Sequence, residues 1–140
     1  TEAEAVAKAH RVISSETSAK MRELFHLNAH EGSGRRARVP GYNVGGKTGT
    51  AEKVVNGRYD GDKRINSFLA AFPIDDPSYV VLVVLDEPQP EAGERAATAG
   101  LNAAPTVANI VSRIGPMLSV TPRFEEGDAV SRAIEVAYQE

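Results

Sequence analysis

The chain has 140 residues, of which 41% are hydrophobic and 25% charged, and its formal net charge is −3. This balance indicates a soluble globular domain with a core of its own, and it argues against a general nucleic-acid or membrane-surface binder. The absence of cysteine excludes disulfides and thiol chemistry, and no apolar run reaches membrane-spanning length. The chain starts at Thr1 and not at methionine, so we expect a processed or engineered piece, with any export signal or membrane anchor outside it.

The first long element that the sequence predicts is a helix over about residues 16–29. Ser14 or Ser15 suits its N-cap, because a serine hydroxyl accepts from the free backbone N–H groups of the first turn. Met21 and Leu24 lie about one turn apart. We therefore expect this helix to pack its apolar face on a sheet.

Two histidines, His26 and His30, lie one turn apart near the end of this helix. A zinc pair uses that spacing, but the metalloprotease pattern needs Glu directly after the first histidine, where this chain has Leu27. No cysteine or further histidine follows nearby to complete a ligand set. We expect exposed histidines at the helix end, and no metal site.

The stretch with the most chemical information is residues 44–52, VGGKTGTAE. Its glycines let the backbone run close to a ligand, because they have no Cβ, and its lysine and threonines supply one positive charge and two hydroxyls. Such a stretch binds an anion. One interpretation is a nucleotide site, because residues 41–48, GYNVGGKT, satisfy the phosphate-loop pattern and residues 80–87 look like a strand ending in a magnesium-binding aspartate.

The surrounding sequence favours a strand over a phosphate loop. A phosphate loop follows a buried strand and opens a helix, whereas residues 31–40 are polar and basic. The three arginines in that segment indicate a solvated loop or the rim of an anion site. Asn56-Gly57 is a turn signal that would end a helix almost at once. Because threonine and valine favour extended structure, we expect a strand over about residues 44–55.

Two further strands are predicted over residues 67–73 and 79–85. A short turn joins them, so they should pair antiparallel, whereas a phosphate loop needs a parallel sheet with a crossover helix. Residues 56–64 look too long for a tight hairpin and polar enough for an exposed loop. The Asp60-x-Asp62 pair in that loop lacks the other ligands of a calcium site.

The last third of the chain predicts a loop over residues 86–100 and then a helix that starts near Pro105. We expect this helix to stop at Gly115-Pro116 and to bury one apolar stripe, formed by Val107, Ile110, Val111 and Ile114. Residues 119–126 look extended and exposed, and Asp128 suits the cap of a last short helix. Together the elements predict an α+β fold, an antiparallel sheet with flanking helices.

In this order of elements the chain resembles the C-terminal part of the transpeptidase domain of class B penicillin-binding proteins. The resemblance covers about residues 12–117, and K-T-G-T-A in this context is fairly specific. The residues that carry it are Arg11-Val12-Ile13-Ser14, Gly41-Tyr42, Gly46-Lys47-Thr48-Gly49-Thr50-Ala51, the stretch from Phe68 to Phe72, Val80 to Pro88, and Ala104-Pro105-Thr106-Val107. The resemblance implies a partial fold of the penicillin-recognising serine enzymes, with residues 1–118 as the C-terminal portion of the domain and 119–140 as a partly helical extension.

The resemblance also implies a substrate and roles for four residues. The substrate would be the D-Ala-D-Ala end of a peptidoglycan stem peptide, which β-lactams mimic. Lys47 would supply positive charge, and the Thr48 and Thr50 hydroxyls would bind the terminal carboxylate. Gly49 would let the strand edge approach the ligand. The Thr50 N–H would be one of two oxyanion donors, and its C=O would accept from the substrate amide.

The chain departs from the family pattern at the nucleophile. It has no S-x-x-K and no S-x-N motif, and the nearest match, Ser33-Gly34-Arg35-Arg36, lies in a loop without the lysine. Without the serine there is no acyl-enzyme, and without its lysine there is no base. We therefore expect this chain alone to be inactive. We also expect it to expose apolar surface that its missing neighbours would cover, and to self-associate.

By resemblance the parent protein would work at the periplasmic face of the bacterial inner membrane, without a cofactor and without nucleic acid. A serine β-lactamase or carboxypeptidase relative is an alternative within the same chemistry, although Thr50-Ala51 and Gly41-Tyr42 favour the transpeptidase. The phosphate-loop protein and a non-catalytic interaction module are alternatives from other classes. The position of Lys47, on an antiparallel strand or before a helix, separates the transpeptidase from the phosphate binder.

Overall fold

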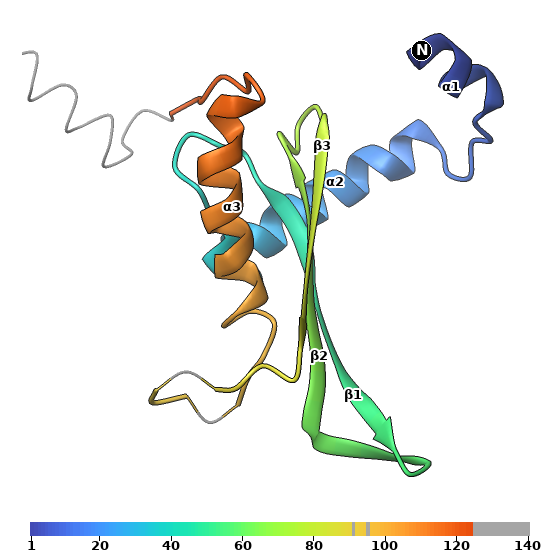
Figure 1. Cartoon of the computed structure of the whole chain (residues 1–140). Coiled ribbons are helices and arrows are strands. Elements are labelled where there is room, and N and C mark those ends of the chain that lie inside the picture. Colours follow the sequence, from blue (N-terminus) through green and yellow to red (C-terminus); the bar gives the residue numbers. More distant parts are fainter. Residues whose placement is uncertain (91, 95, 125–140) are drawn as a thin grey trace, which may run out of the picture.

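A computed structural model describes residues 1–90, 92–94 and 96–124 (Figure 1). The predicted helix from Asp128 therefore lies outside the described residues. Within these ranges no helix is both long and apolar enough to cross a membrane. The elements in chain order are α1 (Glu2–Lys8), α2 (Ser15–His30), the short 3-10 helix η1 (Arg35–Ala37), β1 (Gly45–Val55), β2 (Arg58–Phe72), β3 (Tyr79–Asp86) and α3 (Ala103–Met117).

The three strands form one antiparallel sheet in the order β1-β2-β3. Lys47 of β1 pairs with Leu69 of β2, and Phe68 pairs with Val83 of β3. β3 is built largely from valine and leucine, which favour a pleated, half-buried surface. The α+β class and the antiparallel sheet are as the sequence predicted.

The prediction of an exposed loop over residues 56–64 is wrong. Asn56 and Gly57 form a tight turn with φ values of 50° and 78°, and β2 begins at Arg58, directly after it. Two central residues with positive φ match the right-handed twist of the strands, which is why Asn-Gly joins hairpins. The end of the β1–β2 hairpin forms an arm that extends beyond the rest of the molecule (Figure 1), and most of its residues are exposed. Its polar composition therefore resembles that of a loop, which is why the prediction was wrong.

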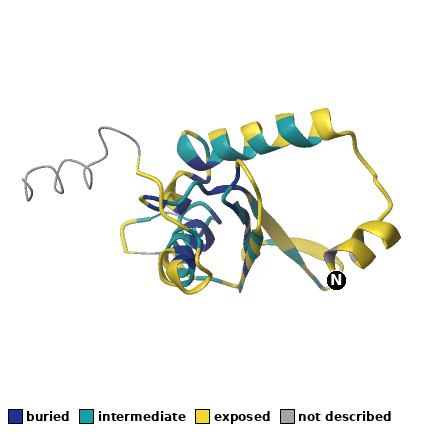
Figure 2. Cartoon of the chain, turned by 90° about the horizontal axis from the view of Figure 1, so that it is seen from above, coloured by how far each residue is buried: buried dark blue, intermediate teal, exposed yellow. Residues whose placement is uncertain are grey.

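The hydrophobic core lies between α3 and one face of the sheet (Figure 2). Phe68, Phe72 and Val83 project from the strands onto Val107 and Val111 of α3, and all of them are buried. This is the apolar stripe that the sequence predicted for the last helix. Asn102 caps the helix through its side chain, which accepts from the Ala103 N–H at 2.7 Å.

The end of α3 differs slightly from the prediction, because the helix continues through Gly115-Pro116 to Met117. Proline is tolerated there because only one hydrogen bond is lost in a turn that already ends. Close packing explains the glycine at position 115, because a Cβ there would lie 2.5 Å from the ring of Tyr42. The helix therefore fits closely against the segment that leads into β1.

The opposite face of the sheet is open. Leu69, Val80, Leu82 and Val84 expose between 46% and 67% of their surface. The expected packing of α2 on the sheet is only partly right, because its C-terminal end contacts β1 and buries Ala29, whereas Leu24 and Leu27 remain about half exposed. The prediction that this chain exposes apolar surface is confirmed.

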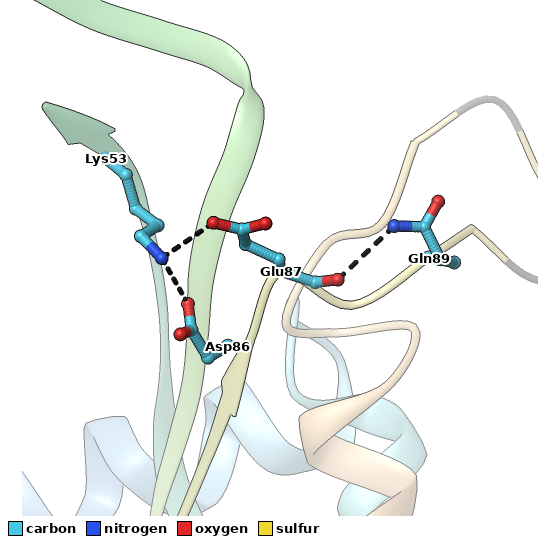
Figure 3. Close-up of polar contacts among 4 residues, drawn as sticks. All are labelled: Lys53, Asp86, Glu87 and Gln89. Carbon is cyan, nitrogen blue, oxygen red and sulfur yellow. Dashed lines mark hydrogen bonds and ion pairs between the residues drawn. The ribbon is translucent and has the colours of Figure 1, made fainter. Parts of the chain in front are cut away.

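A charged cluster joins the two outer strands beyond the core. Lys53 of β1 donates to the carboxylates of Asp86 and Glu87, at 2.9 and 2.7 Å, across β2 (Figure 3). The hydrogen bond that Lys53 donates to Glu87, followed by the one it donates to Asp86, raises the pKa of Lys53 above its ordinary value. The cluster lies where the regular register of β1 and β2 shifts, between residues Glu52 and Lys53 of β1.

Gly46→Ala tests how tightly β1 packs. The added Cβ would collide with the Leu69 carbonyl oxygen and lie 2.6 Å from the Phe68 ring. Overpacking of this kind costs about 1–3 kcal/mol, and we expect that loss in the free energy of unfolding from chemical denaturation. Gly61→Ala is the matched control, because its Cβ would meet only the Glu52 carboxylate, at 3.7 Å, and it should change stability by less than about 0.5 kcal/mol. Equal losses would contradict the packing described for β1.

Candidate functional site at the free edge of the first strand

Lys47, Thr48, Gly49 and Thr50 lie in the first half of β1, whose only neighbour in the described sheet is β2. The phosphate-loop interpretation is wrong, because the residues after Lys47 continue as a strand and no helix begins there. The strand also pairs antiparallel with its neighbour, whereas phosphate loops connect parallel strands through helices. The lysine thus projects from an edge strand.

The backbone of β1 presents its even-numbered residues to the free edge. The Asn28 side chain donates to the Gly46 carbonyl oxygen at 2.7 Å, and Lys47 Nζ donates to the Thr48 carbonyl oxygen at the same distance. Both carbonyls therefore point away from β2. Because N–H and C=O directions alternate along a strand, the N–H and C=O of Thr50 also face the free edge, in the regular stretch of pairing before Glu52.

The hydroxyls of Thr48 and Thr50 lie on one face of the strand, because side chains two residues apart share a face. Thr50 Oγ1 accepts a hydrogen bond from the Ala99 N–H at 3.2 Å. A hydroxyl has one proton to donate, and this bond leaves the Thr50 proton available. Thr48 Oγ1 lies 3.3 Å from Lys47 Nζ, so the ammonium and this hydroxyl meet although their side chains start on opposite faces.

The loop that carries Ala99 is fixed to the sheet by Asn66. This side chain is fully buried, and its Nδ2 donates to the Ala97 carbonyl oxygen at 3.0 Å and to Asn102 Oδ1 at 3.2 Å. Asn66 was not predicted from the sequence as part of this site. A polar residue among the alternating apolar residues of β2 was the available signal, because a buried amide needs partners.

Gly49 lies close to the side chain of its neighbour in the sheet. A Cβ at Gly49 would lie 2.6 Å from the hydroxyl oxygen of Ser67, which is its cross-strand partner. The space in front of Gly49 is therefore already limited by a side chain of β2. Its expected role, to let a ligand approach the strand, stays a prediction.

Ser33 is a second residue at the site that was not predicted from the sequence. Its hydroxyl oxygen lies 2.7 Å from Thr48 Oγ1 and donates to Asn28 Oδ1 at 3.1 Å. From the sequence, this serine was noted only because Ser33-Gly34-Arg35-Arg36 is the nearest match to the S-x-x-K motif and lacks its lysine. Its loop also contains the three exposed arginines, of which Arg36 forms an ion pair with Glu94 at 3.4 Å.

The two histidines are not exposed as expected. His26 and His30 are half-buried, and their rings stack with centroids 3.9 Å apart. They line a cavity of about 640 Å³ together with residues 38–43 and the segment after α3, and Lys47 and Thr48 do not line it. In the part of the chain that the structure describes, no group of three or more potential metal ligands includes them.

The groups at the β1 edge suit an anion. Lys47 can only donate hydrogen bonds, and the two threonine hydroxyls add donors beside it. Charge-assisted hydrogen bonds to an ammonium group are among the stronger ones, and a planar carboxylate can accept several at once. An extended ligand could also pair with the free N–H and C=O of the strand. The geometry therefore fits a peptide that ends in a carboxylate.

Comparison with known proteins identifies a family that this chain matches. The family described as penicillin binding protein transpeptidase domain matches residues 2–112. Stage V sporulation protein D of Bacillus subtilis is 46% identical over 113 residues, which are 81% of this chain and 17% of that protein. The "Probable peptidoglycan D,D-transpeptidase FtsI" of Caulobacter vibrioides is 42% identical over 125 residues, 82% of this chain and 21% of that protein. The chain thus spans about a fifth of these relatives.

A solved structure agrees with the sequence matches. The transpeptidase domain of Burkholderia pseudomallei penicillin-binding protein 3 superposes with a TM-score of 0.73 at 35% identity, over 84% of this chain and 34% of that one. The family match covers more than half of the chain and includes the whole of β1. This chain therefore belongs to the penicillin-binding protein transpeptidase domain family.

Proposed function

We propose that this chain is the carboxylate-binding, C-terminal part of the transpeptidase domain of a peptidoglycan D,D-transpeptidase. The observation that carries the proposal is the gathering of one ammonium and two threonine hydroxyls at the unpaired edge of β1, in a chain of this family. The domain portion would comprise residues 1–118, with 119–140 as an extension. The parent protein would act at the periplasmic face of the inner membrane, with its anchor outside this chain.

The ligand in this proposal is the D-Ala-D-Ala end of a stem peptide, or a β-lactam in its place. Lys47 and the hydroxyls of Thr48 and Thr50 bind the terminal carboxylate. The Thr50 C=O accepts from the substrate amide, and the Thr50 N–H donates to the oxygen that becomes negative during acyl transfer. The outward direction of the Gly46 and Thr48 carbonyls supports this assignment, because it places both backbone groups of Thr50 at the same edge.

Acyl transfer needs a serine nucleophile and a base, and the sequence has neither S-x-x-K nor S-x-N. We therefore expect no covalent adduct when this chain is incubated with a fluorescent penicillin and examined by gel fluorescence and intact mass. A complete transpeptidase domain, such as that of Burkholderia pseudomallei penicillin-binding protein 3, is the positive control. A mass increase equal to one penicillin on this chain would show that it carries its own nucleophile.

Binding without chemistry should still depend on the carboxylate. We expect N-acetyl-D-Ala-D-Ala to shift the backbone amide signals of residues 47–50 in NMR titrations and to bind about tenfold more tightly than its C-terminal amide, because hydrogen bonds to charged groups contribute about 1.5–3 kcal/mol. Thr48→Val and Lys47→Met should reduce this preference. Thr121→Val, in the exposed segment after α3, is the matched control and should keep it. Equal affinity of wild-type chain for acid and amide would contradict the proposed site.

The open face of the sheet should make the isolated chain self-associate, with a second copy covering it. Leu82 is 60% exposed in the middle of this face, and burial of apolar area favours association by about 25 cal/mol per Å². We expect concentration-dependent oligomers in analytical ultracentrifugation, and Leu82→Lys should shift the chain towards monomer without unfolding it. Val83→Lys, on the buried face, should unfold the chain instead. A strictly monomeric wild-type chain at high concentration would contradict this proposal.

A further inference from the structure

The hydroxyl of Ser33 belongs to the same polar group as Thr48 and Lys47. Ser33 Oγ lies 2.7 Å from Thr48 Oγ1, which in turn lies 3.3 Å from Lys47 Nζ. Ser33 is an exposed residue. Two hydroxyls and one ammonium thus form a continuous chain of hydrogen bonds on the surface beside the β1 edge.

The groups at the two ends of this series of hydrogen bonds, Asn28 and Lys47, fix the direction of each hydroxyl proton between them. Asn28 Nδ2 donates to the Gly46 carbonyl oxygen at 2.7 Å, so its Oδ1 points to Ser33 and can only accept. The Ser33 proton is therefore donated to Asn28. At the other end Lys47 can only donate, so Thr48 Oγ1 accepts from it. The remaining contact needs a donor, and this is the Thr48 proton, which points to Ser33 Oγ.

The position of Ser33 is held by close contacts of the backbone around it. A Cβ at Gly34 would lie 2.8 Å from the Phe68 ring, and a Cβ at Gly32 would lie 2.5 Å from Asn28 Oδ1. On the other side, a Cβ at Gly100 would collide with the Ser33 carbonyl oxygen. The absence of side chains at these three positions lets the loop lie against α2, β2 and the loop before α3 at once.

We propose that Ser33 is a positioning residue of the carboxylate subsite, and that it orients the hydroxyl of Thr48. In the empty site Ser33 Oγ accepts the Thr48 proton and keeps Thr48 Oγ1 beside the lysine ammonium. When a carboxylate binds, Thr48 turns its proton to the ligand, while the ammonium continues to donate to Thr48 Oγ1. Ser33 stays hydrogen-bonded to Asn28 at that moment, so no buried partner is left unsatisfied by the exchange.

This inference rests on the proposed function, and its test uses the same two ligands with the full chain. We expect Ser33→Ala to raise the preference for N-acetyl-D-Ala-D-Ala over its C-terminal amide by about three- to tenfold, the factor that corresponds to one neutral hydrogen bond, because the Thr48–Ser33 bond that must break when the carboxylate binds is then absent. Ser33→Thr keeps the hydroxyl and should retain the preference within about twofold. Ser78→Ala, an exposed serine in the turn before β3, is the matched control and should behave as wild type.

The ratio of the two affinities separates an effect on the carboxylate from a general effect on the loop, because a loop that is merely disturbed weakens both ligands equally. An unchanged ratio in Ser33→Ala, with wild-type chain still preferring the acid, would overturn the role of Ser33 and leave the proposed function intact. No preference in wild-type chain would overturn both. Should Ser33→Ala unfold the chain, Ser33→Cys is the second variant, since its thiol has nearly the same shape but is a weak hydrogen-bonding group. It too should raise the ratio, and an unchanged ratio would count against Ser33.

Discussion

The site depends on one constraint, namely that β1 has a strand neighbour on one side only. Pairing with β2 uses the N–H and C=O groups of every second residue, and the groups in between must find other partners or remain open. Two of these, the carbonyls of Gly46 and Thr48, are satisfied by the side chains of Asn28 and Lys47. In the proposed function, the next residue in the series, Thr50, would keep its backbone groups for a ligand.

The groups around this edge come from three separate parts of the chain. Asn28 and Ser33 contribute side chains from the end of α2 and the loop after it, and Ala99 contributes its backbone N–H from the loop before α3. Glycines bring these parts together, since Gly34 lies against Phe68 and Gly100 lies against the backbone of Ser33. Packing on the buried face of the sheet therefore also positions the groups at the exposed edge, because it fixes the loop after α2 and the loop before α3.

The sequence predicted the strand that carries Lys47, the antiparallel pairing and both long helices, because each of these has a strong local pattern. It missed the hairpin at Asn56-Gly57, although it recognised the turn signal, because the polar residues of the arm were interpreted as a loop. A strand that extends beyond the core needs no apolar face, so its composition carries little information. Ser33 and Asn66 were missed for a different reason. Ser33 meets Thr48, which is 15 residues away, and Asn66 bonds to Ala97 and Asn102, which are 31 and 36 residues away. A pattern within one segment does not show such contacts.

Within the proposed function, the residues of this edge would contribute to catalysis in two different ways. The carboxylate of the substrate keeps its charge throughout acyl transfer, so Lys47 and the hydroxyls of Thr48 and Thr50 bind ground state and transition state alike. Such uniform binding lowers KM and does not raise kcat. The Thr50 N–H differs, because it would face an oxygen that becomes negative only in the transition state. One residue of β1 would thus bind the substrate through its side chain and accelerate the reaction through its backbone, and substitution of the side chain alone would remove only the first effect.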